Sequence, residues 1–266
     1  MSGKGNKTGG PTQSLATHTL TDLYYRDKNL VTEMMGCMTF TQAMFLHIMG
    51  RDATPADIAI IDAVLLALME HGLTPSAIAT RLTYHSAPEA LQAAVAAGLL
   101  NVGSTFIGTM ENCSKLLRDM VNGDEDLDTA AARIVAEHRA AKRHIPGFGH
   151  HLHKPDDPRT PKLFEIARAN SVKGNYIEAI KALSRAVDTA MGRHMTINAT
   201  GGTAAVLSEI GIPPEVMRGF AVIARAAGLV AHIAEERDIP TARMIWDVVE
   251  DEIPYAGGAP VGKKGA

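Results

Sequence analysis

The sequence predicts an all-α protein. Helix-start signals recur along the chain, and no stretch of six residues alternates convincingly between apolar and polar side chains. Hydrophobic residues make up 46% of the 266 positions and charged residues 21%, which is an ordinary globular balance. A chain of this length can bury the core of one large domain, or of one large and one small domain.

The clearest helix-start signal is Thr54-Pro55-Ala56-Asp57. The threonine suits the N-cap, the proline the first helical position and the aspartate the third. Apolar residues then recur at helical spacing from Ile58 to Leu68. Thr74-Pro75-Ser76 repeats the signal, so a second helix is expected to run to Leu82.

Further helices are expected from the same signals at residues 86–100 (after a capping box at 86–89), 128–144, 161–169, 176–191, 213–233 and 241–250. The helix at 128–144 ends in Arg139, Lys142 and Arg143. Cations there suit the negative end of the helix dipole.

Composition excludes several classes of protein. A net charge of −3 provides no basic field for nucleic acid, and two cysteines do not suggest a disulfide-stapled secreted domain. No apolar run reaches the roughly 18 residues that span a bilayer, and the first residues lack the apolar core of a signal peptide. We expect a soluble cytoplasmic protein with flexible tails at residues 1–15 and 257–266, and no membrane partner.

The most loop-like internal segment, residues 145–161, carries most of the interesting polar residues. It contains Gly147-Phe148-Gly149-His150, and Arg159 follows. The glycines let the backbone approach a ligand closely. His150 can donate to an oxygen on which negative charge develops, and the Arg159 fork suits a carboxylate.

Two other interpretations of this loop stay open on the residues alone. It can be a solvated loop with scattered histidines, or a metal site built from His150, His151 and His153. Neighbouring histidines in one loop are weak support for a metal without carboxylate or cysteine partners. We therefore expect no metal.

Three further blocks accompany the Gly147–His150 loop. They are Phe-Thr-Gln-Ala-Met-Phe-Leu with Met-Gly-Arg at residues 40–51, Glu-His-Gly-Leu-Thr-Pro-Ser at 70–76, and Ala-Arg-Ala-Ala-Gly-Leu-Val-Ala-His at 224–232. Together the four blocks cover about residues 20–250 and resemble, in order, those of the citrate synthase superfamily. The resemblance implies a large helical domain (16–105 and 206–256) with a smaller helical domain (106–205) inserted, and a homodimer.

The segment Gly103-Ser104-Thr105-Phe106-Ile107-Gly108 resembles one branch of that superfamily. Citrate synthases have Gly-Pro-Leu-His-Gly-Gly there, and that histidine helps to form the enol of acetyl-CoA. Phe106 stands in its place, as in the citryl-CoA lyase-like branch, which includes the lyase part of ATP-citrate lyase. A phenyl ring cannot share a proton, so citrate synthase chemistry is disfavoured.

The resemblance implies a role for each matching residue. His150 and Thr200 occupy catalytic positions, and the substrate side comprises His71, Arg159, Phe106 and Asn198. The coenzyme A side comprises Lys142, Arg143, Ile145, Gly147, Phe148 and Gly149. The implied ligand is a small carboxylate or an acyl-CoA, with coenzyme A as part of the substrate or product.

Two departures from the family pattern concern the chemistry. Thr200 stands where the family has its catalytic aspartate, and a hydroxyl cannot directly replace a carboxylate base. Ile239 stands where many relatives have an arginine on a second substrate carboxylate; Arg237 or Arg243 are candidate substitutes.

Three explanations follow from these departures. The first is an acyl-CoA carbon–carbon lyase (EC 4.1.3 type), which cleaves a 3-hydroxyacyl-CoA carrying carboxylates by a retro-Claisen step with another group in place of the aspartate. The second is an enzyme of this fold with a different reaction on an acyl-CoA or a polycarboxylate. The third is a non-catalytic binding or regulatory protein. The retained His71, His150 and Arg159 favour the first.

Overall fold

The computed structural model describes residues 11–103, 105 and 107–258. The described chain is mainly helical: α1 (Phe40–Met49), α2 (Pro55–Met69), α3 (Pro75–Ser86), α4 (Leu91–Leu100), α5 (Thr109–Asn122), α6 (Leu127–Ala140), α7 (Arg159–Ala169), α8 (Asn175–Met191), α9 (Ala199–Glu209), α10 (Pro214–Asp238), α11 (Ala242–Glu252) and a π-helical segment, η1 (Leu30–Met34). The prediction of an all-α fold is confirmed, because helices make up most of the described structure.

A small antiparallel sheet precedes the helices and was not predicted. Its strands β1 (Ala16–His18), β2 (Leu23–Tyr25) and β3 (Lys28–Asn29) pair in sequence order. Ala16 lies opposite Tyr25, and Tyr24 opposite Asn29. Strands of two or three residues are too short to give a recognisable alternation.

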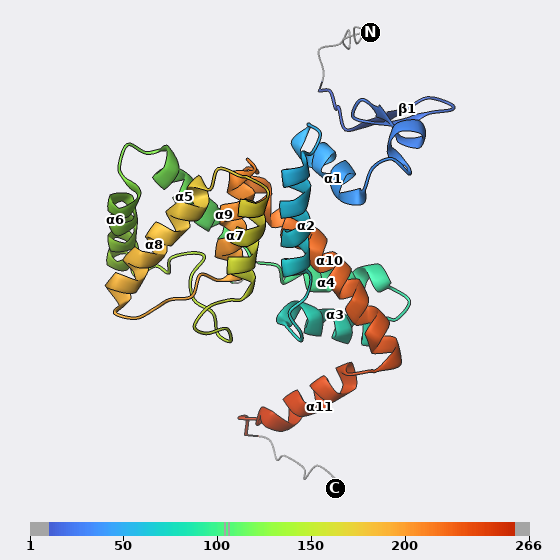
Figure 1. The fold of residues 1–266 in the computed structure, drawn as a ribbon. Helices are drawn as coiled ribbons and strands as arrows, with labels where there is room; N and C mark the ends of the chain where they lie inside the picture. Colours follow the sequence, from blue (N-terminus) through green and yellow to red (C-terminus); the bar gives the residue numbers. More distant parts are fainter. Residues whose placement is uncertain (1–10, 104, 106, 259–266) are drawn as a thin grey trace.

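The helices pack in pairs on both sides of α2. Helices α6 and α8 pack together, as do α5 and α9, and α9 also contacts α7 and α8. The long α10 contacts α2, α3, α4 and α5 (Figure 1). The predicted division into two domains at 105/106 and 205/206 stays a prediction, and most of the predicted tails (1–10 and 259–266) lie outside the described residues.

Helix α9 and helix α10 form much of the core. In α9, the run Gly201–Ser208 is buried on every side. Helix α10 is long and apolar enough to cross a membrane by length and composition, but half of the relevant window is buried inside the protein. Because core helices of globular proteins meet the same criterion, we interpret α10 as a core helix.

Helices α3 and α10 run four and five residues past their predicted ends at Leu82 and Ile233, and two other predicted helix bounds are wrong for a local reason. The expected capping box at Ser86 does not form: Ser86 is the last residue of α3, its hydroxyl donates to the Leu82 carbonyl, and α4 begins only at Leu91. Helix α6 ends at Ala140 rather than at 144, because the backbone turns into the left-handed region at Lys142 (φ 50°).

Candidate active site

The loop that carries His150 is fixed to the start of α9. Phe148 forms an isolated antiparallel bridge with Ile197. The Asn198 N–H donates to the Gly147 carbonyl (3.1 Å), and the Asn198 side-chain amide donates to the Gly149 carbonyl (2.9 Å). The Gly149 N–H also donates to the Thr196 carbonyl (2.8 Å), so three hydrogen bonds to one short segment set the position of the residue before His150.

Glycine is required where this loop meets α9. Gly147 has φ 90°, and a Cβ there would lie 2.7 Å from the Cys113 sulfur. A Cβ on Gly201 would lie 2.5 Å from the Gly147 carbonyl oxygen. Contacts this short leave no room for a side chain, so the two glycines allow the loop and the helix to touch.

Three histidine rings meet beside this loop. His71, at the end of α2, lies 5.6 Å from His150 and 5.5 Å from His153, measured between ring centroids. His150 and His153 lie 4.5 Å apart by the same measure. The Nε2 atoms of His71 and His153 approach to 3.3 Å. The structure thus brings together the predicted His71 and His150, and adds His153.

The tautomer of His150 follows from its hydrogen bonds. Its Nδ1 accepts the N–H groups of Leu152 (3.1 Å) and His153 (2.9 Å). A neutral ring that accepts at Nδ1 carries its proton on Nε2. His150 is therefore a hydrogen-bond donor through Nε2, as the predicted role on a substrate oxygen requires.

Both predicted histidines are held in the neutral form. Burial lowers the pKa of His71, and the charge of Arg159 and the neighbouring His153 lower it further. Burial also lowers the pKa of His150, followed by the effect of His153. Since an unperturbed histidine titrates near pH 6.5, both rings are neutral at pH 7.

The histidine cluster has the spacing of a metal site but not the chemistry. One ring nitrogen from each of His71, His150 and His153 lies within 4.8 Å of the others. A histidine ligand needs a free lone pair on the nitrogen that faces the metal. In His150, Nδ1 already accepts two N–H groups and Nε2 holds the proton. The cluster as folded therefore fits a hydrogen-bonding site, and the absence of a metal stays a prediction.

Arg159 is already partly engaged. Its Nε and Nη2 donate to the two carboxylate oxygens of the buried Asp157 (2.9 and 2.7 Å), and its Nη1 donates to the Ala67 carbonyl (3.2 Å). A guanidinium has five N–H groups, so two remain for a ligand. Asp157 also accepts the Ala199 N–H (3.0 Å), which links the arginine to the start of α9.

Arg225, on α10, is a site residue to which the sequence analysis gave no role. Its side chain is buried; among the residues that the structure describes, its Nη1 reaches only the Thr74 hydroxyl at a long 3.4 Å, and its Nε has no hydrogen-bond partner. Burial is the main cause that lowers its pKa, and the charge of Arg159 adds to it. The Ala-Arg-x-x-Gly block of the sequence contained this residue.

Gly228, one turn later, lets α10 approach the Met69 backbone, where a Cβ would lie 2.2 Å from the carbonyl oxygen.

A chain of polar contacts supports His71 from the core. Glu70 accepts the N–H groups of His71 (2.7 Å) and Gly72 (2.8 Å), and its second oxygen lies 3.0 Å from Nε2 of His232, though out of line for a good hydrogen bond. Arg81 donates to Nδ1 of His232 (2.9 Å). The position of His71 therefore depends on α3 and α10.

The hydroxyl of Thr200 is engaged within the protein. It donates to the Asn198 side-chain oxygen (2.7 Å) and lies 2.8 Å from the Thr109 hydroxyl. Asn198 is thereby occupied as well, because its oxygen also caps α9 at the Gly201 N–H (3.0 Å). The catalytic role of Thr200 and the substrate role of Asn198 stay predictions.

The predicted coenzyme A residues lie on the same loop, before His150. Lys142 and Arg143 are exposed beyond the end of α6, and Ile145 is half-buried against the core. Phe106 lies outside the described residues. The coenzyme A contacts of all these residues stay predictions.

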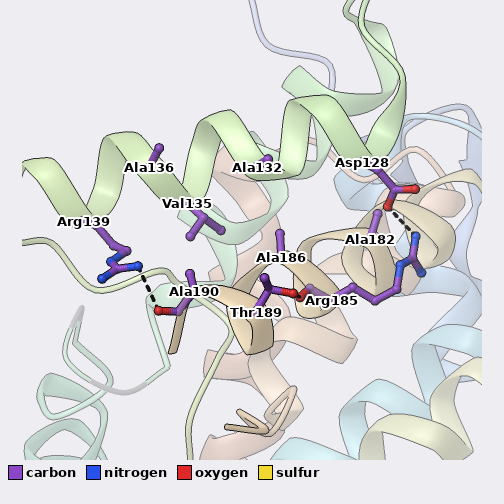
Figure 2. Close-up of a pocket in the computed structure, with 10 residues that line it drawn as sticks. All are labelled: Asp128, Ala132, Val135, Ala136, Arg139, Ala182, Arg185, Ala186, Thr189 and Ala190. Carbon is purple, nitrogen blue, oxygen red and sulfur yellow. Dashed lines mark hydrogen bonds and ion pairs between the residues drawn. The ribbon is translucent and has the colours of Figure 1, made fainter. Parts of the chain in front are cut away.

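A separate groove lies between α6 and α8. It has a volume of about 400 Å³ and a floor of alanines. At one end Arg139 donates to the Ala190 carbonyl, and at the other Arg185 pairs with Asp128 (Figure 2). None of the predicted site residues that the structure describes lines it, so we do not assign the ligand site to this groove.

Comparisons with known proteins agree with the fold. The family model described as "Citrate synthase, C-terminal domain" matches residues 17–245. The structure is similar to that of citryl-CoA lyase from Hydrogenobacter thermophilus, with a TM-score of 0.83 and 29% identity over 95% of this chain and 97% of that one. It also resembles ATP citrate lyase from Methanothrix soehngenii, solved with citrate and coenzyme A, with a TM-score of 0.79, 20% identity, and 96% and 43% coverage.

Sequence relatives are more distant. The citrate synthase-like protein oryE of Aspergillus oryzae is 23% identical over 253 residues, which are 83% of this chain and 55% of that protein. The citrate synthase of Haloferax volcanii is 25% identical over 198 residues, which are 73% and 51% of the two chains. The chain thus spans about half the length of these relatives.

Proposed function

This chain belongs to the citrate synthase family, and from that premise we propose that it is an acyl-CoA carbon–carbon lyase. Its substrate would be a 3-hydroxyacyl-CoA that carries carboxylates, of the citryl-CoA type. The similarity to citryl-CoA lyase from Hydrogenobacter thermophilus supports this choice, because the two chains match over almost their whole lengths.

The buried, poorly partnered Arg225 is the observation that carries the proposal. A buried charge without a partner costs several kcal/mol, so proteins keep one where a ligand supplies the opposite charge. Arg225 and Arg159 both act on His71 through their charges, which places the two cations at one site. The acidic side chains nearest to them, Asp157 and Glu70, are already engaged. The site therefore suits an anionic ligand such as a carboxylate.

His150 supplies the group that acts on the substrate oxygen. In the proposed cleavage the 3-hydroxyl gives its proton to water and becomes a carbonyl. The carbon–carbon bond breaks, and its electron pair passes into the thioester enolate, which then takes a proton from water at carbon. His150, neutral and protonated on Nε2, donates to the oxygen while its charge changes. Residue 200 is not the base in this scheme, because Thr200 has no accessible pKa near neutrality.

A screen of 3-hydroxyacyl-CoA thioesters with detection of the oxoacid product tests this function. We expect coenzyme A-bound product and an oxoacid from citryl-CoA or a shorter 3-hydroxyacyl-CoA. Titration calorimetry with coenzyme A and acetyl-CoA provides the matched binding measurement. The proposal would be overturned if none of these thioesters were turned over and no heat of binding were measured.

We also propose a homodimer, as the family resemblance implies. Helix α11 supports this assembly, since it extends from the rest of the protein (Figure 1) and leaves Met244, Trp246 and Val249 exposed. Exposed apolar side chains grouped on one element are typical of an interface. A chain has a mass of 28.3 kDa, so a light-scattering mass near that value would contradict the dimer.

A further inference from the structure

The imidazole ring of His153 lies beside that of His71. Both Nε2 atoms point to one place, 3.3 Å apart, although 82 positions separate the residues in the sequence. The backbone N–H of His153 is held by Nδ1 of His150, so the loop that orients His150 also orients His153. His153 is half-buried.

The contact between the two rings sets which of their nitrogens hold protons. A hydrogen bond between two Nε2 atoms needs one nitrogen with a proton and one without. In the ligand-free pair one Nε2 therefore accepts, and its neutral ring holds its proton on Nδ1. The ring of His71 also forms a hydrogen bond with the residue's own backbone carbonyl, which keeps its proton on Nδ1, so a proton at its Nε2 is an additional one. A carboxylate oxygen only accepts hydrogen bonds, so it can bind to both nitrogens only if each carries a proton.

The charged surroundings keep the additional proton off the free pair. Arg159 faces the pair from α7 and Arg225 from α10, and both charges disfavour a further cation at His71. His150 and His151 face it from its own loop. Two carboxylates are also close, and both already have partners. Asp157 forms an ion pair with Arg159, and Glu70 accepts the His71 N–H and lies near His232.

We propose that His153 binds a substrate carboxylate together with His71, and that this binding takes up one proton. The ligand class, a di- or tricarboxylate, rests on the proposed function. The bound anion offsets the positive charge of the two arginines and accepts hydrogen bonds from both rings. A proton on the second Nε2 therefore becomes favourable when the ligand binds. The proton comes from solvent, and no bond is made or broken in the ligand.

The linkage predicts how affinity depends on pH. Where the free pair lacks the second proton and the bound pair holds it, affinity falls about tenfold for each pH unit of increase. A site whose protonation does not change on binding has an affinity independent of pH in this range.

Titration calorimetry with citrate as the probe tests the inference. The heat is measured at pH 7.5 and constant salt in buffers of different ionisation enthalpy, which gives the number of protons taken up. We expect a value near one for the wild type. His153→Gln keeps a donor but cannot titrate, and should reduce the uptake to near zero and the affinity about tenfold. His151→Gln, an exposed neighbour that stacks on His150 at 4.8 Å, is the matched control and should keep the uptake.

Two results would overturn the inference: a wild type that binds citrate without proton uptake, and an uptake that His153→Gln leaves unchanged. A wild type that does not bind citrate at millimolar concentration would overturn it as well. The proposed function fails separately, since proton-linked citrate binding without cleavage of any acyl-CoA leaves the inference standing. Melting curves of the two variants establish that each is folded.

Discussion

The different surroundings of two buried arginines, Arg225 and Arg81, predict opposite effects of the same substitution. Arg81 is 1% exposed, and donates to His232 (2.9 Å) and Glu236 (2.7 Å) and pairs with Glu235. Arg225 is 5% exposed and has one long contact. We change each to methionine, which retains most of the apolar stem and removes the charge.

Arg225→Met should stabilise the ligand-free protein. The unpartnered buried Nε of Arg225 costs about 1–3 kcal/mol, and the nearby Glu70 offsets part of this, so we expect a gain of about 1–2 kcal/mol. A gain of 1 kcal/mol raises the melting temperature of a chain of this size by about 2–4 °C. Arg81→Met leaves Glu236 and His232 without their partner and should cost about 3–5 kcal/mol.

Urea unfolding with and without citrate measures both effects. Citrate should raise the stability of the wild type, because a ligand that binds only the folded state shifts the equilibrium towards it. It should not raise that of Arg225→Met. If Arg225→Met loses stability as Arg81→Met does, then Arg225 has a structural role and our argument for an anion site is wrong.

Three other predictions concern the loop and its chemistry. Thr200→Asp restores a carboxylate and should raise citryl-CoA cleavage about 10²-fold in an assay of oxoacid formation; an unchanged rate would show that no base is missing there. Gly201→Ala should lower the unfolding free energy by about 1–3 kcal/mol, whereas Gly219→Ala, which meets no atom within 4 Å, should not; equal urea midpoints would refute the close contact. Because folding lowers the pKa of His71 and His150, the unfolded chain takes up protons first as pH falls below about 6.5. The melting temperature should therefore fall from pH 7 to 5, and less so in the His71→Gln/His150→Gln double variant.

The sequence predicted those helices whose start is encoded in a few adjacent residues. At Thr54 the predicted capping box forms, with Asp57 N–H donating to the threonine hydroxyl (3.2 Å) and the Thr54 N–H donating to the aspartate (2.8 Å). Ser86 presents the same residue pattern but lies at the end of α3. Helix α9 begins in the Gly-rich Ala199–Gly202 and has low local helical preference, so its formation depends on burial between α5, α7 and α8.

The site was predictable to the extent that it lies on one loop. The Gly147–His150 motif and His71 do come together, as the family resemblance implied. Other properties depend on residues far apart in the chain. The contact of His153 with His71 and the poor partnering of Arg225 follow from the packing of α2, α7 and α10 against the loop, whereas the tautomer of His150 follows from the folded shape of the loop itself. No local sequence pattern contains these distances.

The role of His150 in cleavage is the central claim, and one kinetic comparison tests it most directly. Formation of the oxoacid from citryl-CoA is measured at pH 7.5 for the wild type and His150→Gln, with citrate binding as the check that the site is intact. We predict turnover by the wild type and a loss of about 10²–10³-fold in the variant, the effect of removing one donor from a developing oxyanion. Equal rates for the two proteins would contradict the account.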